Sequence, residues 1–245
     1  GIIFVILFGI RQLKMDDPFL DIRVFKHFEF SLAAILSGVT NLAMVGIEMV
    51  LPLYIQNLRG ESAFHSGLIL LPGALMIGIM SPITGRIFDR YGARKMAITG
   101  MTLLTLGTIP FVFLTENSSF LMIIILYAIR MVGVALVMMN VTTSGMNSLP
   151  LDKISHGTAV NNTFRQVLSS IGTAILVSVL TTTTNNNMPA KSMLKTLPLQ
   201  YKNGAINATL DGFHASFAIS ILALVLSFFL KKGNRARERS EKVDS

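Results

Sequence analysis

The sequence predicts an all-α integral membrane protein with six full transmembrane helices and the end of a seventh. Of its 245 residues, 51% are hydrophobic and only 14% are charged, whereas an average soluble domain is about 25% charged. The mean hydropathy is +0.61, and several apolar segments reach the roughly 20 residues that a helix needs to cross a bilayer. The segments between them carry most of the lysines and arginines, so the apolar stretches indicate membrane spans.

The chain begins within an apolar run, GIIFVILFGI at residues 1–10, which is too short to span a membrane. We interpret this run as the end of a truncated transmembrane helix and expect the chain to be part of a longer polypeptide. Residues 11–29 alternate charged and apolar side chains. This pattern is typical of an amphipathic connector on the cytoplasmic membrane surface; an ordinary loop is the alternative.

Residues 30–230 form the predicted transmembrane bundle. Its apolar segments cover residues 30–56, 65–87, 97–114, 120–147, 158–180 and 213–230. Residues 231–245 form a basic tail.

The distribution of Lys and Arg predicts the orientation, because basic residues are retained on the cytoplasmic side of a membrane. Fifteen of them lie in the connector, the loop after residue 85, the link at Lys153 and the tail, whereas four lie in the alternate loops. We therefore expect the connector and the C-terminus of this multi-pass membrane protein to be cytoplasmic. The same distribution argues against a nucleic-acid partner, since no groove of mixed aromatic and basic residues is visible.

The residues show no enzyme signature. There is no cysteine and therefore no thiol-ligated metal, and the four histidines are scattered along the chain. We expect no cofactor and no metal site, and interpret the protein as a non-enzyme whose direct partner is the lipid bilayer.

The loop GRIFDRYGARK, at residues 85–95, carries the clearest motif. It resembles the signature loop of the major facilitator superfamily, which recurs between the second and third helices of each half of that fold. The matching residues are Gly85, Ile87, Asp89, Arg90, Gly92, Arg94 and Lys95.

Two further segments resemble the fourteen-helix drug/proton antiporter branch of that family: PFLDIRVFKHFEF before the first span, and GTAVNNTFRQVLSSIGTAI in the fifth. The resemblance implies that the chain is the C-terminal half of such a protein, a six-helix half-bundle whose partner is the missing N-terminal half. It also implies transport by alternating access of a small lipophilic or cationic substrate, with the proton gradient as the energy source.

The charged loop is predicted to be a conformational latch. Gly92 permits a tight turn, and Gly85 allows two helices to approach closely. Asp89 is placed to face the positive end of a helix dipole, while Arg90, Arg94 and Lys95 can hold acidic headgroups. The alternative is that the loop only anchors the cytoplasmic side.

Two charges within the spans predict the transport site, because a charged side chain in mid-membrane costs about 2.5–3.5 kcal/mol and needs a reason. Counting ~1.5 Å per residue from the outer ends, Glu48 and Arg130 lie at depths about one helical turn apart, so the two can meet across facing helices. We hypothesise that Glu48 takes up a proton and competes with a cationic substrate, and that Arg130 tunes its proton affinity. A static ion pair is the alternative.

Other polar residues in the spans have two possible roles. Asn41 and Asn140 either line the cavity or make hydrogen bonds between helices. Arg165, with Asn162 and Gln166, forms a candidate gating contact, although an arginine near a helix end can also simply snorkel to the headgroups.

The leading functional prediction is proton-coupled multidrug efflux, and so a contribution to antibiotic resistance. The alternatives are a transporter of another small solute, such as an amino acid, siderophore or osmolyte, and a non-transporting membrane remnant or interaction protein. We expect that this segment alone does not transport, because six spans supply only one wall of a cavity that twelve core helices enclose.

Overall fold

The structure is a computed structural model that describes residues 7, 10–15, 18, 20–115, 117–187 and 198–230. Within these residues, six helices are long and apolar enough to cross a membrane, which confirms the predicted all-α membrane fold. The long helices are α2 (Phe28–Leu53), α3 (Ala63–Tyr91), α4 (Ala93–Val112), α5 (Phe120–Asn147), α6 (Ile154–Asn187) and α7 (Pro198–Phe228). The predicted helix end at residues 1–10 and the tail at 231–245 lie largely or wholly outside the described residues.

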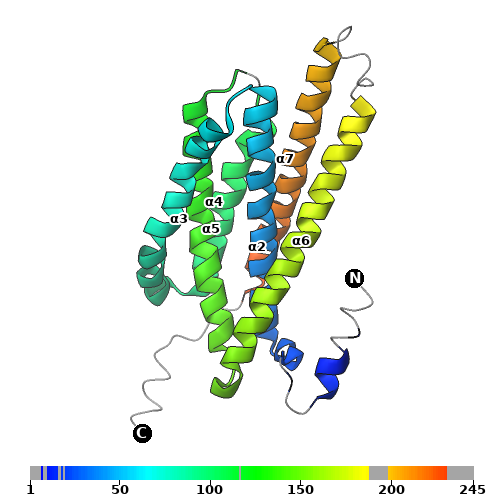
Figure 1. Ribbon diagram of the computed structural model, residues 1–245. Coiled ribbons are helices and arrows are strands. Elements are labelled where there is room, and N and C mark those ends of the chain that lie inside the picture. The colour runs from blue at the N-terminus through cyan, green and yellow to red at the C-terminus, as the bar shows by residue number, and fades with distance from the viewer. Residues whose placement is uncertain are drawn as a thin grey trace.

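The six helices run up and down in one bundle, as Figure 1 shows. Helices α2 and α4 each pack on both α5 and α7, α3 packs mainly on α5, and α6 packs on α2 and α7. Helices α3 and α6 therefore flank the bundle. In the most apolar 18-residue stretch of each, only 17% (α3) and 11% (α6) is buried.

The outward side of α3 is apolar. Leu68, Leu71, Leu75 and Ile79 are between 45% and 56% exposed. Such a row of large apolar side chains is costly in water but favourable against lipid or other membrane helices. This exposure agrees with a membrane-embedded bundle.

Local sequence sets the ends of the helices. The Ser62 side chain accepts a hydrogen bond from the His65 backbone N–H at 3.1 Å and so caps the N-terminus of α3. Pro52 lies near the end of α2, which passes into a π-helical turn, η2 (Tyr54–Leu58). Gly92 separates α3 from α4 with φ +79° and ψ 164°, a conformation essentially restricted to glycine. The tight turn predicted at Gly92 is thus present.

A pair of glycines brings α4 and α5 into backbone contact. A Cβ atom on Gly133 would lie 2.6 Å from the Gly100 carbonyl oxygen and 2.7 Å from the Leu104 nitrogen. Close approach through small residues is a common way for membrane helices to associate, because lipid gives no hydrophobic drive between them. The neighbouring core side chains include Met101, Leu104 and Val137.

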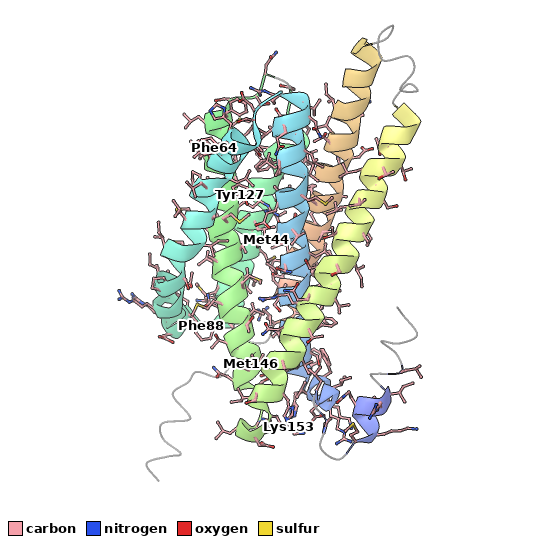
Figure 2. The ribbon with its side chains drawn as sticks, in the orientation of Figure 1. Met44, Phe64, Phe88, Tyr127, Met146 and Lys153 are labelled. Atoms are coloured by element: carbon pink, nitrogen blue, oxygen red, sulfur yellow. The ribbon has the colours of Figure 1, made fainter. Side chains whose placement is uncertain are left out.

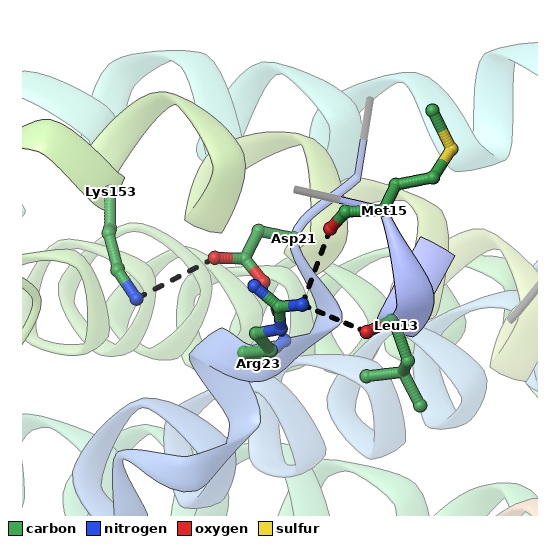
Figure 3. Close-up of polar contacts among 5 residues, drawn as sticks. All are labelled: Leu13, Met15, Asp21, Arg23 and Lys153. Atoms are coloured by element: carbon green, nitrogen blue, oxygen red, sulfur yellow. Dashed lines mark hydrogen bonds and ion pairs between the residues drawn. The ribbon is translucent and has the colours of Figure 1, made fainter. Parts of the chain in front are cut away.

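The connector before α2 is held against the link between α5 and α6 (Figure 3). Asp21 caps the short helix η1 (Ile22–Lys26) by accepting from the Arg23 N–H at 3.0 Å, and it forms an ion pair with Lys153 at 3.6 Å. Lys153 ends the short helix η3 (Leu151–Lys153). The Arg23 guanidinium donates to the carbonyl oxygens of Leu13 and Met15 at 2.8 and 3.3 Å. Two segments predicted to lie on the same side of the membrane are therefore in contact.

Candidate functional site

Arg130 lies at the centre of the bundle and joins three helices. It belongs to α5, and its side chain is completely buried. Its Nε donates to Thr108 Oγ1 of α4 at 3.1 Å, and its Nη2 donates to the backbone carbonyl of Ala43 in α2. Two charge-assisted hydrogen bonds thus fix the guanidinium.

The third nitrogen of this guanidinium is the exception. Among the described residues, Arg130 Nη1 is the buried side-chain nitrogen or oxygen atom that has no hydrogen-bond partner. Buried donors are normally satisfied. Arg130 therefore keeps one donor free while the other two nitrogens hold the helices.

Glu48 lies on α2, five residues after Ala43, and is partly buried. It interacts electrostatically with Arg130, but within the part of the chain that the structure describes no ion pair of 4.0 Å or less joins the two. The structure brings the two predicted charges into one region without a direct salt bridge between them.

Tyr127 is a third member of this cluster, and the sequence analysis missed it. Its side chain is 3% exposed. It interacts electrostatically with Glu48 and Arg130, although no hydrogen bond of 3.5 Å or less joins its hydroxyl to either of them among the described residues. Figure 2 labels Tyr127 inside the bundle, between Phe64 at one end and Phe88 towards the other. Its spacing of three residues from Arg130 places both side chains on one face of α5. That spacing was the signal available in the sequence.

The two candidate asparagines have different surroundings. Asn41 is partly exposed and precedes Glu48 by two helical turns, so both lie on the same face of α2. Asn140 is 1% exposed, and its Nδ2 donates to the Leu136 carbonyl of its own helix at 2.7 Å. Asn140 therefore bonds within α5 rather than to another helix.

The candidate gating residues lie on α6. Asn162 and Gln166 are exposed and line a shallow hollow along this helix together with Ser170. Arg165 is partly buried. Asn161 points the other way: it is 2% exposed and accepts a hydrogen bond from Ser37 of α2 at 3.2 Å.

The segment predicted as a loop, residues 85–95, is helical except at Gly92: it forms the end of α3 and the start of α4. Hydropathy placed the end of the span at residue 87, whereas the helix continues through the charged residues to Tyr91.

Asp89 and Arg90 are exposed, and the Arg90 guanidinium lies 5.5 Å from the ring centroid of Tyr91. Arg94 donates to the Phe228 carbonyl at the end of α7 at 3.3 Å. Apart from its chain neighbours and the backbone of its own helix, no described atom lies within 4 Å of the position that a Cβ atom would take at Gly85. The close approach predicted at Gly85 is therefore not made between described helices of this chain.

Six helices that are long and apolar enough to cross a membrane, with a buried arginine and a partly buried carboxylate in two of them, define a polytopic membrane protein with charged groups within its spans. The chain belongs to the Major Facilitator Superfamily, whose family profile matches residues 5–173. Relatives of the chain are named as transporters.

Three bacterial relatives illustrate the similarity. The chain is 44% identical to YcnB, an uncharacterised MFS-type transporter of Bacillus subtilis (strain 168), over 98% of this chain and 49% of the relative. It is 35% identical to the lincomycin resistance protein LmrB of the same organism, over 95% of this chain and 48% of the relative. It is 29% identical to the multidrug resistance protein Stp of Mycobacterium tuberculosis (strain ATCC 25618 / H37Rv), over 71% of this chain and 32% of the relative. The chain thus spans about half the length of YcnB and LmrB.

Proposed function

We propose that this chain is the C-terminal half of a fourteen-helix drug/proton antiporter that exports small lipophilic cations by alternating access. The chain spans about half the length of YcnB and LmrB. Its six membrane helices are half of the twelve core helices that enclose the cavity in such a transporter. The names of LmrB and Stp, which refer to lincomycin and multidrug resistance, favour efflux of drug-like molecules. Protons flowing down their gradient supply the energy, and no bound cofactor takes part.

Glu48 is the observation that carries the proposal. It is a partly buried carboxylate in a membrane-spanning helix, where an ionisable residue is retained at a cost and marks a transport pathway by default. Arg130 donates its two hydrogen bonds to the Thr108 hydroxyl and the Ala43 backbone carbonyl rather than to this carboxylate. Glu48 is therefore available to bind either a proton or a cationic substrate, and this exclusive choice couples the two.

The remaining predicted residues have supporting roles in this proposal. Asn41 lines the substrate path below Glu48, and Asn162 with Gln166 forms a polar gating surface on α6. Asp89 and Arg90, at the end of α3, form a latch whose partners lie in the N-terminal half, and both side chains are exposed here. The connector and the tail face the cytoplasm of a bacterial cell.

The test is transport by the native polypeptide that contains this chain, reconstituted in proteoliposomes with a pH indicator inside. Ethidium, a lipophilic cation, and lincomycin serve as probes. We expect the wild-type protein to move protons when a probe is added. We expect Glu48→Gln to lose this proton movement while it still binds the probe. The matched control is Glu61→Gln, which removes a carboxylate that pairs with His65 at 2.6 Å near the N-terminus of α3.

The outcomes separate the alternatives. Proton-coupled exchange that responds only to metabolites, and not to ethidium or lincomycin, would assign another solute. No gradient-dependent movement of any probe would favour a non-transporting membrane protein. Full proton-coupled exchange by Glu48→Gln would refute the role of Glu48.

A further inference from the structure

Helices α2 and α6 interlock through glycines and leucines that alternate along both helices. Each helix presents one of these residues per turn, at intervals of four, and a leucine of one helix faces a glycine of the other at each level. The three pairs, in chain order, are Gly38 with Leu168, Leu42 with Gly172, and Gly46 with Leu176. Both members of a pair advance together along the chain, so the two helices run in the same direction in a single register.

The leucines fill the space that the glycines leave. A Cβ atom on Gly38 would lie 2.4 Å from Leu168 Cδ1, and a Cβ atom on Gly172 would lie 2.3 Å from Leu42 Cγ. Real Cβ atoms essentially never come within 3.0 Å of another heavy atom. Glycine is therefore what allows each leucine to reach the backbone of the facing helix. Leu42 makes the tighter contact, because its Cγ and not only the end of its side chain is involved.

Both ends of the interlock are held by further contacts. At one end, Ser37 of α2 donates a hydrogen bond to Asn161 of α6 at 3.2 Å. At the other end, the next pair in the same register is Val50 with Leu180. A Cβ atom on Gly212 of α7 would lie 2.9 Å from Val50 Cγ2 and 3.1 Å from Leu180 Cδ2. Helix α7 therefore closes the contact between α2 and α6 at this end.

The alternation of glycine and leucine opposes a shift of α6 by one turn. One turn is about four residues, or ~6 Å along the axis. Such a shift would bring Leu42 opposite Leu168 or Leu176 instead of Gly172. Two leucines at one level overpack the contact and two glycines at the next leave a void, and both changes cost free energy. A one-turn ratchet, by which packed helices exchange neighbours, is thus closed to this pair.

The interlock also fixes which side of α6 faces away from α2. Asn162, Gln166 and Ser170 follow the same four-residue period, but they lie two residues out of step with Leu168 and Gly172, which places them ~200° around the helix. They are accordingly exposed and line the hollow along α6. Helix α6 packs on α2 and α7 and is largely exposed elsewhere. The polar surface of α6 therefore takes its position from these two helices.

We propose that α2 and α6 move as one unit during transport, and that Leu42 and Leu168 are positioning residues that set the polar surface of α6 relative to Glu48. This inference rests on the proposed function, which places the gate on α6 and the proton-binding carboxylate on α2. Glu48 follows Gly46 by two residues, so it lies within the interlocked part of α2. A movement of the gating surface is carried to the carboxylate, and α2 does not bend independently of α6.

A disulfide at the tightest pair tests the common movement. Leu42 Cγ lies 2.3 Å from the Cβ position of residue 172. With one further C–C bond of ~1.5 Å, the two Cβ atoms are at most about 3.8 Å apart, a spacing that suits a disulfide. Leu42→Cys/Gly172→Cys also removes the leucine that would clash, and this chain has no other cysteine. The matched control, Leu42→Cys/Gly172→Ala, has a similar volume and lacks the second sulfur.

The native polypeptide that carries either pair is reconstituted in proteoliposomes and oxidised with copper phenanthroline. Ethidium-driven proton exchange is measured before and after reduction with dithiothreitol, and peptide mass spectrometry verifies the cross-link. We expect the cross-linked protein to exchange protons as fast as its reduced form and as the oxidised control. Loss of exchange that only the cross-linked protein shows, and that reduction restores, would overturn the inference and leave the proposed function standing.

A wedge in the same contact tests the positioning role. Gly172→Ala pushes Leu42 away from α6, and we expect the displaced gate to slow exchange about tenfold. Leu42→Ala in the Gly172→Ala protein frees the space and should restore most of the lost rate, which a second destabilising change would not do. Gly78→Ala is the control, because nothing lies within 4 Å of a Cβ atom there. If Leu42→Ala adds a further loss instead of a rescue, the positioning role is wrong.

Spin labels separate a failure of this inference from a failure of the proposed function. Labels on Ile35→Cys of α2 and Val177→Cys of α6, at side chains that are 38% and 40% exposed, report the distance between the helices without any transport. We expect one narrow distance distribution, with and without ethidium and on either side of neutral pH, even if no probe drives exchange and the proposed function fails. A second distance, or one that changes with these conditions, would overturn the inference whatever the transport assay shows.

Discussion

Arg130 should be replaceable by methionine at little cost in stability, although it is completely buried and bonded to two other helices. Methionine keeps most of the length of the side chain and removes the charge. The substitution leaves no group stranded at Thr108, whose hydroxyl still donates to the Leu104 carbonyl at 2.6 Å. Ala43 contributes a backbone carbonyl from within α2, where the helical hydrogen bond remains.

The magnitude follows from two opposing contributions. Two hydrogen bonds from a charged donor contribute about 1.5–3 kcal/mol each. Against this, burying a guanidinium costs several kcal/mol, and in this protein one of its nitrogens, Nη1, has no partner among the described residues. We therefore expect the unfolding free energy of Arg130→Met to lie within ~2 kcal/mol of wild type. Arg130→Ala also opens a cavity and should be about 2–5 kcal/mol less stable than Arg130→Met.

The assay is unfolding of the native polypeptide in bicelles by titration with SDS, followed by circular dichroism. Wild type, Arg130→Met and Arg130→Ala are compared under one lipid composition. If Arg130→Met proves as unstable as Arg130→Ala, the hydrogen bonds of Arg130 and not its volume hold the helices together, and the reasoning above is wrong.

Three further predictions concern stability and use the same titration. Gly92→Ala should lower the unfolding free energy by about 1–3 kcal/mol, because φ +79° suits only glycine; an unchanged value would contradict this strain. Gly133→Ala should cost about 1–3 kcal/mol by pushing α4 from α5, whereas Gly78→Ala should not destabilise, and equal effects would show that the glycine contact is unimportant. Lys153→Gln should cost under about 1 kcal/mol, since its pairing with Asp21 is partly exposed; a larger loss would mean that the connector braces the whole bundle.

The spans could be predicted because length and apolarity alone define a membrane helix. The segment predicted at residues 120–147 coincides with α5. The ends elsewhere were harder, since caps rather than hydropathy decide them. The second span was predicted to begin at residue 65, but α3 begins at Ala63 behind the Ser62 cap. Helix α6 extends beyond the predicted end at residue 180, through polar residues, to Asn187.

The candidate site could be predicted only in part. Glu48 and Arg130 stand out because each is a charge in an apolar span, and the depth count placed them within about one turn of each other. The count carries no side-chain direction, so it could not foresee that Arg130 bonds to Thr108 and Ala43. Tyr127 escaped notice because a tyrosine in a span reads as one more apolar residue, and its contact with Gly73 requires the packing of α3 on α5.

The most direct test of the account is whether binding of a cation releases a proton from Glu48. The native polypeptide in unbuffered detergent solution is mixed with ethidium, and a soluble pH indicator records the proton released for each ethidium bound. We predict proton release by wild type and by Glu61→Gln, and none by Glu48→Gln although it still binds ethidium. Undiminished release by Glu48→Gln would contradict the account and assign the exchanged proton to another group.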